Sequence, residues 1–165
     1  MKSKGWYKII KDEKYFDEFL GIFSDFHDYR ITHMEYDCET NTLLLYLGYD
    51  TGLEGALLKF IHVEDMHICP CTEYESDWLY GATVKMTSSY SLIWCNADDV
   101  CDIDEIRADK TLTWIESEQI RFAWLDKDNQ IIPLTDERLN PVWKIMNYET
   151  MQYESVPKHF RVFEV

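Results

Sequence analysis

The fold is decided by residues 11–37, KDEKYFDEFLGIFSDFHDYRITHMEYD, where helical periodicity gives way to strand periodicity. Up to residue 26 the large apolar side chains recur every three or four residues, which predicts an amphipathic helix. Asp12 is placed to cap its first turn, and Glu13 favours a helix N-terminus. Gly21 costs up to about 1 kcal/mol relative to Ala, so we expect it to serve close packing. The apolar stripe consists of Tyr15, Phe16, Phe19, Leu20, Ile22, Phe23 and Phe26, and the helix should end near residues 24–26.

The chain after this junction predicts a sheet. Alternating or apolar segments indicate strands at 31–37, 42–47, 56–62, 82–87, 90–95, 112–116 and 120–125, the last two paired with each other. Residues 42–47, TLLLYL, are apolar on both faces and should form a central strand or one covered by the helix. We therefore assign the α+β class, with an N-terminal amphipathic helix packed on a mainly antiparallel, curved or barrel-like sheet, in one domain of residues 1–165.

The remaining segments predict a loop and two short elements. Residues 96–109 carry six acidic side chains and are interpreted as an exposed loop. Asn140 and Pro141 suit the N-cap and first position of a helix, so we predict a short helix near residues 142–147. Residues 160–165 are interpreted as a final strand.

The composition is strongly acidic, because 31 Asp and Glu residues against 16 Lys and Arg residues give a net charge of −15. Nucleic acids and anionic lipids recruit proteins through positive charge, so neither is expected as a partner. A basic protein is the partner that this field would steer toward the chain. Solubility alone also accounts for an acidic surface, and that interpretation stays open.

The N-terminal residues and the cysteines predict a location. Residues 1–6, MKSKGW, carry charge, and no apolar stretch of the kind found in a secretion signal follows them. No window approaches the ~18 apolar residues of a spanning helix. The five Cys residues are an odd number without the spacing of a disulfide framework. We therefore expect a cytoplasmic protein with reduced thiols.

The junction between helix and strand is the first candidate site. His27 and Asp28, with Asp25 and His33 nearby in the chain, bring an imidazole close to carboxylates. Such a group can hold a metal or move a proton. The same residues can equally cap a turn and satisfy carbonyls freed at a helix end.

The acidic segment is the second candidate site. Nearby predicted strands carry Trp94, Trp114 and Trp124, and acidic residues beside exposed aromatic rings are typical of a surface that meets a basic protein. A solvated loop above an aromatic core is the alternative. The candidate contact residues are Asp98, Asp99, Asp102, Asp104 and Glu105.

Motifs for metals, cofactors and catalysis are not complete in the sequence. His67, Cys69 and Cys71 would share one side of an extended segment, but a structural zinc site normally has Cys-x2-4-Cys with a second matching pair. There is no glycine-rich phosphate loop, no Gly-x-Ser-x-Gly and no His-Glu-x-x-His. We expect no metal and no cofactor, and we assign no catalytic residue.

Several segments carry a resemblance to a known group of domains. Phe26-His27-Asp28, Ile31, Tyr36-Asp37, the apolar segment 43–47 and the later LKFIHV of residues 58–63 resemble small uncharacterised bacterial domains with a Phe-His-Asp signature. Some of these domains are grouped with immunity proteins of polymorphic toxin systems. The resemblance covers about a third of the chain. It implies a helix before the signature, a largely antiparallel sheet after it, and a cytoplasmic protein that neutralises a partner toxin.

Two functions follow from these observations. The first is a non-enzymatic acidic protein-binding domain, of immunity type, that neutralises a basic toxin. The alternative is a small enzyme or ligand-binding domain with a pocket around His27 and Asp28, and a housekeeping domain with neither role is a third. A toxin gene beside this one favours the first, and a metabolic operon favours the alternative.

Overall fold

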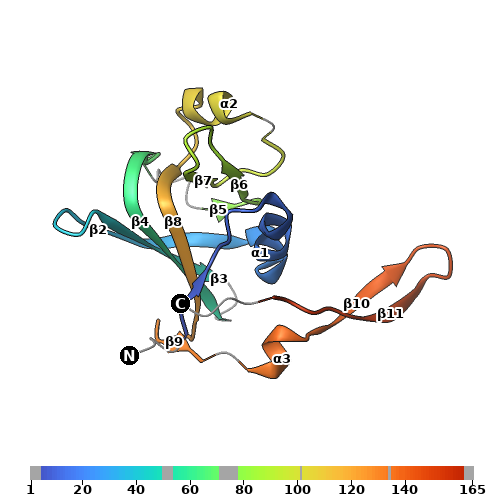
Figure 1. Ribbon diagram of the computed structural model, residues 1–165. Helices are drawn as coiled ribbons and strands as arrows, with labels where there is room; N and C mark the ends of the chain where they lie inside the picture. Colours follow the sequence, from blue (N-terminus) through green and yellow to red (C-terminus); the bar gives the residue numbers. More distant parts are fainter. Residues whose placement is uncertain (1–4, 50–53, 71–77, 101, 134, 162–165) are drawn as a thin grey trace.

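The computed structural model describes residues 5–49, 54–70, 78–100, 102–133 and 135–161 (Figure 1). Its helical segments are η1 (Glu13–Tyr15), α1 (Phe16–Ile22), η2 (Ser24–Phe26), α2 (Ile103–Ala108) and α3 (Asp136–Leu139), where η denotes a 3-10 turn. Its strands are β1 (Tyr7–Lys8), β2 (Tyr29–Asp37), β3 (Thr42–Tyr49), β4 (Gly55–His67), β5 (Trp78–Leu79), β6 (Thr83–Met86), β7 (Leu92–Cys95), β8 (Trp114–Leu125), β9 (Ile131–Ile132), β10 (Val142–Asn147) and β11 (Gln152–Pro157).

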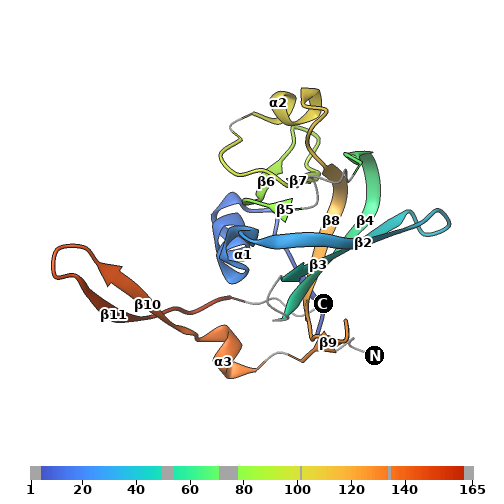
Figure 2. The ribbon, with the colours of Figure 1, turned by 180° about the vertical axis from the view of Figure 1, so that it is seen from behind.

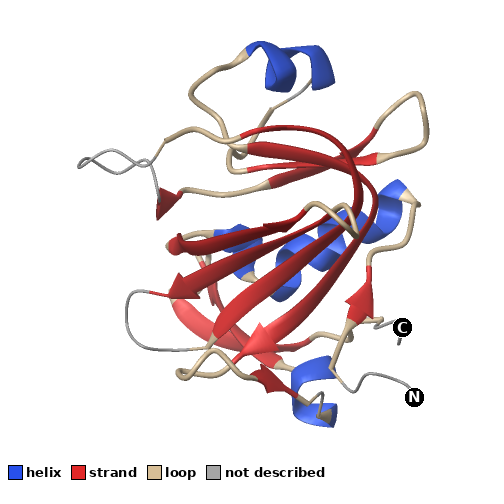
Figure 3. Cartoon of the chain, turned by 90° about the vertical axis from the view of Figure 1, so that its left-hand side faces the viewer, coloured by secondary structure: helices blue, strands red, loops and turns tan. Residues whose placement is uncertain are grey.

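Most strands belong to one antiparallel sheet that curls into a half-barrel (Figure 3). The hydrogen-bonded order is β5-β2-β3-β4-β8-β7-β6, and β1 and β9 also pair with β8. The right-handed twist of adjacent strands makes a sheet of this size curl, which leaves one face concave. The segment η1-α1-η2 packs against that face (Figures 1 and 3). The predicted α+β class, with an N-terminal helix on a curved antiparallel sheet, is confirmed.

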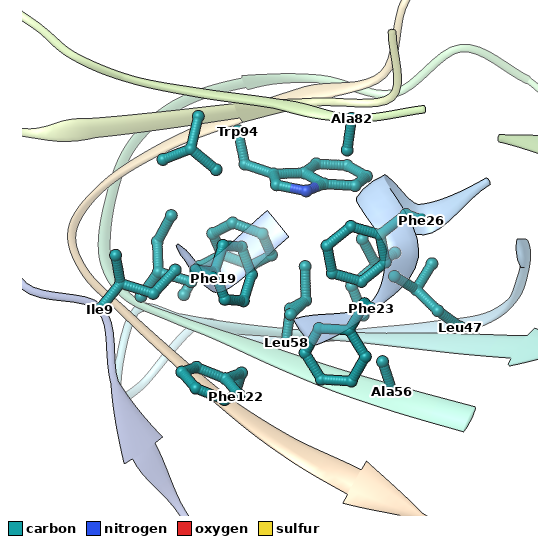
Figure 4. Packing of buried hydrophobic residues seen from close by; sticks show 14 of the residues in the cluster. Ile9, Phe19, Phe23, Phe26, Leu47, Ala56, Leu58, Ala82, Trp94 and Phe122 are labelled. Atoms are coloured by element: carbon teal, nitrogen blue, oxygen red, sulfur yellow. The ribbon is translucent and has the colours of Figure 1, made fainter. Parts of the chain in front are cut away.

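The core lies between α1 and the concave face of the sheet (Figure 4). Phe19 of α1 and Phe23, which follows the end of α1, contact the ring of Phe122 on β8 at centroid distances of 5.0 and 5.8 Å. Phe26 of η2 stacks on Phe23 at 4.9 Å and is fully buried, as is Trp94 of β7. Burying an aromatic side chain of this size contributes about 1.5–3 kcal/mol. The stripe predicted from the sequence therefore attaches the helix to the sheet, and Asp12 caps η1 by accepting from the backbone N–H of Lys14.

Strand β3 lies between β2 and β4, as its apolar sequence predicts. Leu43, Leu45 and Leu47 are buried in the core, whereas Leu44 and Tyr46 on the other face are half-buried. The strand is therefore both central and covered by the helix. Residues 38–41 form the expected hairpin connection, in which the Asp37 side chain accepts from the backbone N–H groups of Glu39 and Thr40.

The prediction of two paired strands at 112–116 and 120–125 is wrong, because residues 114–125 form the single strand β8. The residues between the two apolar segments, Ser117, Glu118 and Gln119, are polar. In the structure, Glu116 and Ser117 are buried, and β8 pairs with β4 from Gly55↔Leu125 to His67↔Trp114. A register shift between Val63 and Asp65 of β4 lets one long strand accommodate this irregular stretch.

The predicted helix near residues 142–147 is also wrong. These residues form β10, which pairs with β11 into a two-stranded antiparallel sheet. This hairpin, residues 142–157, is called the arm, and it extends away from the half-barrel (Figures 1 and 2). The backbone N–H of Lys158 bonds to the carbonyl of Pro141, so pairing with a later segment overrides the helix-cap pattern.

At the base of the arm, an aromatic contact joins the arm to the segment that follows it. Trp143 packs against Phe160 at a ring-centroid distance of 5.9 Å. Phe160 and Arg161 belong to no strand, contrary to the prediction for 160–165, and residues 162–165 lie outside the described residues. A Cβ placed on Gly21 would meet Trp143 at 4.0 Å, an ordinary contact, so the expectation of close packing at Gly21 is wrong.

Candidate binding cleft at the helix-to-strand corner

The corner between α1 and β2 has an unusual backbone. Ser24, Asp25 and Phe26 have φ angles of 51°, 55° and 59°, and Asp28 has a φ of 67°. Left-handed conformations are uncommon outside glycine, and a run of three is costly for side chains of this size. The burial of Phe26 and the hydrogen bond from the Asp28 backbone N–H to the carbonyl of Leu79 hold the corner in place.

His27 and Asp28 form an exposed pair at this corner. Nδ1 of His27 lies 2.8 Å from Oδ2 of Asp28, and more than half of each side chain is exposed to solvent. An exposed pair of this kind contributes about 0–1 kcal/mol, so it does not by itself hold the corner together. His33 is not part of the pair, because it lies on β2 against the ring of Tyr46.

A cleft of about 460 Å³ lies beside the corner and joins segments that are distant in the sequence. Its lining residues come from α1, from the corner, from the segment around β6 and from the loop after β7. The cleft therefore brings His27 together with Asp98 and Asp99, whereas Asp28 stays outside the lining. The lining is Asp17, Leu20, Ser24, Asp25, His27, Tyr80, Gly81, Ala82, Thr83, Val84, Lys85, Asp98, Asp99 and Val100.

The charge of the cleft is negative. Four aspartates, at positions 17, 25, 98 and 99, line it together with one lysine, Lys85. Gly81 allows the loop to come close, since a Cβ at that position would lie 2.5 Å from the Cβ of Asp98. Carboxylates from two separate segments thus share one concave surface, where their fields add.

The rest of the predicted acidic loop is a helix. Asp102, Asp104 and Glu105 lie outside the cleft lining, at the start of α2, where Asp102 is the N-cap and accepts from the backbone N–H of Asp104 at 3.0 Å. Acidic side chains in a first helical turn interact favourably with the helix dipole. The interpretation of 96–109 as loop alone is therefore corrected. Ile106, which is fully buried, fixes α2 on the sheet.

A buried polar network ties α2 to the sheet. Nη2 of Arg107 donates to Oε2 of Glu116 at 2.5 Å, and the hydroxyl of Ser91 donates to Oε1 at 2.6 Å. Burial would raise the pKa of the Glu116 carboxyl, but the hydrogen bonds from Ser91 and Arg107 outweigh it and hold that pKa below its ordinary value. Sequence reasoning missed this network, although a glutamate inside an apolar strand was a signal for a buried partner.

The aromatic part of the predicted interface differs from the expectation. Trp94, Trp114 and Trp124 are all buried, so they present no surface to a partner. The exposed rings belong to tyrosines instead, and Tyr80, which is 62% exposed, lines the acidic cleft. The combination of acidic groups and an accessible aromatic ring is present, but with a different residue.

A second groove adjoins the cleft at the base of the arm. It has a volume of about 630 Å³ and is lined by Gly21 and by residues 142–145 of the arm. Ser24 and Asp25 line both the groove and the acidic cleft, so the two hollows meet at the strained corner. One partner can therefore contact both surfaces.

The predicted cysteine site is only partly described, because Cys71 lies outside the described residues. His67 bonds through Nδ1 to the carbonyl oxygen of Leu112, and the backbone N–H of Cys69 donates to the hydroxyl of Thr113. Within the ranges that the structure describes, no group of three or more His, Cys, Asp or Glu side chains is arranged to hold a metal ion. No described helix is long and apolar enough to cross a membrane.

Comparisons with protein-family models, with curated proteins and with solved structures found no match to this chain.

Proposed function

We propose that the protein is a non-enzymatic, acidic protein-binding domain of immunity type, which neutralises a basic toxin by binding it. One observation carries the proposal: the corner, through Ser24, Asp25 and His27, and residues 98–100, which are distant in the sequence, line one cleft that holds four aspartates. A Lys or Arg side chain of a partner would find several carboxylates within reach there. The interaction requires neither nucleic acid nor a membrane, and it is consistent with a cytoplasmic pair of proteins.

The arm supplies the apolar area that an interface also needs. Tyr148, Met151 and Tyr153 are each at least 69% exposed. Interfaces are enriched in Tyr and Met, and their binding energy concentrates in a few aromatic or Arg anchors. Because the groove of the arm adjoins the acidic cleft, a partner with a basic side chain beside an apolar one matches the whole surface.

The experiment pairs the chain with a toxin domain encoded beside its gene. Co-expression should restore growth, and the two proteins should copurify as a complex. The association rate is then measured at low and high salt for the double variant Asp98→Asn/Asp99→Asn. Asp128→Asn/Glu137→Gln is the matched control, because it removes two exposed carboxylates elsewhere and leaves the same net charge.

The cleft variant should associate about tenfold more slowly than the control at low salt, and this difference should shrink as salt screens the charges. Equal association rates for the two variants would show that Asp98 and Asp99 do not take part in the interface. A further variant, Asp104→Asn/Glu105→Gln, tests whether α2 also contacts the partner. Asp102 is left unchanged, because its side chain caps α2.

The alternative function, a small enzyme or ligand-binding domain, is favoured by the His27–Asp28 pair. A carboxylate 2.8 Å from one ring nitrogen orients an imidazole, and His27 lines the cleft. His27→Ala separates the two functions, because it removes the only imidazole of the cleft lining and none of its carboxylates. Loss of toxin binding by the Asp98 and Asp99 variant with retention by His27→Ala supports the protein-binding function.

A further inference from the structure

Three basic residues form a row across the outer face of the sheet. In the register of the strands, Lys8 of β1 lies opposite Arg121 of β8, and Arg121 lies opposite Lys59 of β4. Directly opposed residues of antiparallel strands point to the same face. The sequence neighbours of each basic residue, such as Ile120 and Phe122, are buried, so the row faces away from the core. The row is thus separate from the acidic cleft.

The row has no carboxylate partner among the described residues. Like charges directly opposite each other destabilise a strand pair. The chain has nearly twice as many acidic as basic residues, so three adjacent basic residues are unusual in its composition. The stability of the folded chain therefore does not explain why three cations lie next to each other on neighbouring strands. A bound anion is the partner that would offset their repulsion.

Two side chains of the row, those of Arg121 and Lys59, are held in position. Nε of Arg121 donates to the side-chain oxygen of Gln119 at 2.9 Å, while its two terminal nitrogens have no partner among the described residues. Nζ of Lys59 lies 5.8 Å from the centre of the Trp6 ring. Both Lys59 and Arg121 are half-buried, so their charges are partly shielded from water. A guanidinium anchored at Nε offers a fixed pair of donors.

A groove beside the row gives an anion room to bind. It has a volume of about 620 Å³ and is lined by Lys8, Lys11 and Arg121, among others, whereas Lys59 lies at its side, outside the lining. Nζ of Lys11 already donates to the carbonyl of Tyr90. Its one carboxylate, Glu118, is already paired with Nδ1 of His62 at 2.6 Å. The balance of charge in the groove is therefore positive, within a protein that is otherwise acidic.

We propose that the row of Lys8, Arg121 and Lys59 binds a compact anion of the phosphate class, such as a phosphate ester or an oligophosphate. Adjacent strands lie about 4.8 Å apart, so the three cations span roughly 10 Å, which matches one to three linked phosphoryl groups. A long polyanion would extend onto the acidic remainder of the surface, whereas a compact anion stays beside the basic row. Bidentate contacts from Arg121 suit phosphoryl oxygens.

Calorimetric titration of the full chain with inorganic phosphate, pyrophosphate and tripolyphosphate at low salt tests the proposal. One molecule should bind per chain, and affinity should rise with the number of phosphoryl groups. Arg121→Gln and Lys8→Gln should each weaken binding by roughly tenfold or more, as the loss of a charge-assisted hydrogen bond predicts. Lys127→Gln, in an exposed turn, is the matched control and should bind like the parent.

The melting temperature without ligand gives a second measurement. Lys8→Gln relieves like-charge repulsion at an exposed position, so it should leave the melting temperature unchanged or raise it by roughly 1–4 °C. Weaker binding at full stability then supports a ligand site. Absence of saturable binding up to about 10 mM tripolyphosphate, or binding of a hexaglutamate peptide in its place, would overturn the proposal. Equal affinities for Lys8→Gln and the control would also overturn it.

Discussion

The half-barrel and the arm are both built from antiparallel strand pairs, yet only one of them has a core. In the half-barrel, alternate residues of β3 and runs of consecutive residues in β4 and β8 are buried, many of them in the aromatic cluster under α1. In the arm, none of residues 142–157 is buried, and Val142, Tyr148 and Tyr153 are more than 60% exposed. Strand pairing alone does not bury apolar surface. A second layer does, and an isolated two-stranded hairpin is marginal in water.

Amide hydrogen exchange should show the largest contrast between the two regions. Amides of β4 and β8 should exchange only through global unfolding, which costs about 5–15 kcal/mol in domains of this kind. Amides of β10 and β11 should exchange through local opening at a small fraction of that cost. Native-state exchange followed by mass spectrometry measures both. Equal protection in the two regions would show that something covers the arm in solution.

Truncation of a core ring should have the next largest effect. Phe19→Ala removes the ring that contacts Phe23, Phe26 and Phe122, and should lower the free energy of unfolding by about 3–5 kcal/mol. Tyr153→Ala in the arm should change it by less than about 0.5 kcal/mol. Urea denaturation measures both variants. Similar losses would mean that the arm and the half-barrel unfold as one packed unit.

Two glutamates that accept hydrogen bonds extend the comparison to polar groups. Glu116 is buried between Arg107 and Ser91, whereas Glu154 of the arm accepts from the Asn147 amide in solvent. Glu116→Gln should cost about 1–3 kcal/mol at neutral pH, because Arg107 and Ser91 lose the charged acceptor of their hydrogen bonds, and Glu154→Gln should cost almost nothing.

The pH dependence of Glu116 follows from its lowered pKa. Because the pKa in the folded chain lies below the ordinary value of 4.5, the stabilisation is fully present above pH 4.5 and is lost as the pH falls through the folded-state pKa. The difference in unfolding free energy between the parent and Glu116→Gln should therefore narrow in acid. A difference that stays constant from pH 7 to pH 3 would exclude the ionised carboxylate as its source.

The last substitution lies where the two regions meet. Gly21→Ala should stabilise the chain by about 0.5–1 kcal/mol, because alanine favours a helix and its methyl group would meet Trp143 at an ordinary distance. Thermal unfolding measures the change. A loss of stability instead would show that the base of the arm packs on α1 more tightly than a 4.0 Å contact implies.

The sequence predicted the elements whose patterns are local. The stripe of Phe16, Phe19 and Phe23 identified the helix, and the apolar residues 42–47 identified a central strand. It did not predict β10, because the helix-cap pattern of Asn140 and Pro141 yields to pairing with β11, a segment with no pattern of its own. Local signals fail where a distant partner decides the structure.

The sequence identified individual residues of the candidate site, but it did not indicate that they lie together. His27 and the pair Asp98 and Asp99 were each singled out, but nothing in their spacing indicates that one cleft contains them all. Asp102 and Glu105 were grouped with the same pair by proximity in the chain, whereas they belong to the first turn of α2. The left-handed backbone at Phe26 also has no sequence signal, because large aromatic residues rarely adopt it.

The pairing of β4 with β8 has a consequence for the time at which the chain can fold. These strands form the centre of the half-barrel, but they are separated in the sequence by β5, β6, β7 and α2. On a ribosome that adds about 5–20 residues per second, β4 is complete some seconds before β8 exists. During that interval the meander β2-β3-β4 presents a long edge with no neighbour, and Glu64 and Asp65 lie on that edge strand. Charged side chains on an unpaired edge strand disfavour pairing between nascent chains until β8 has been synthesised and pairs with β4.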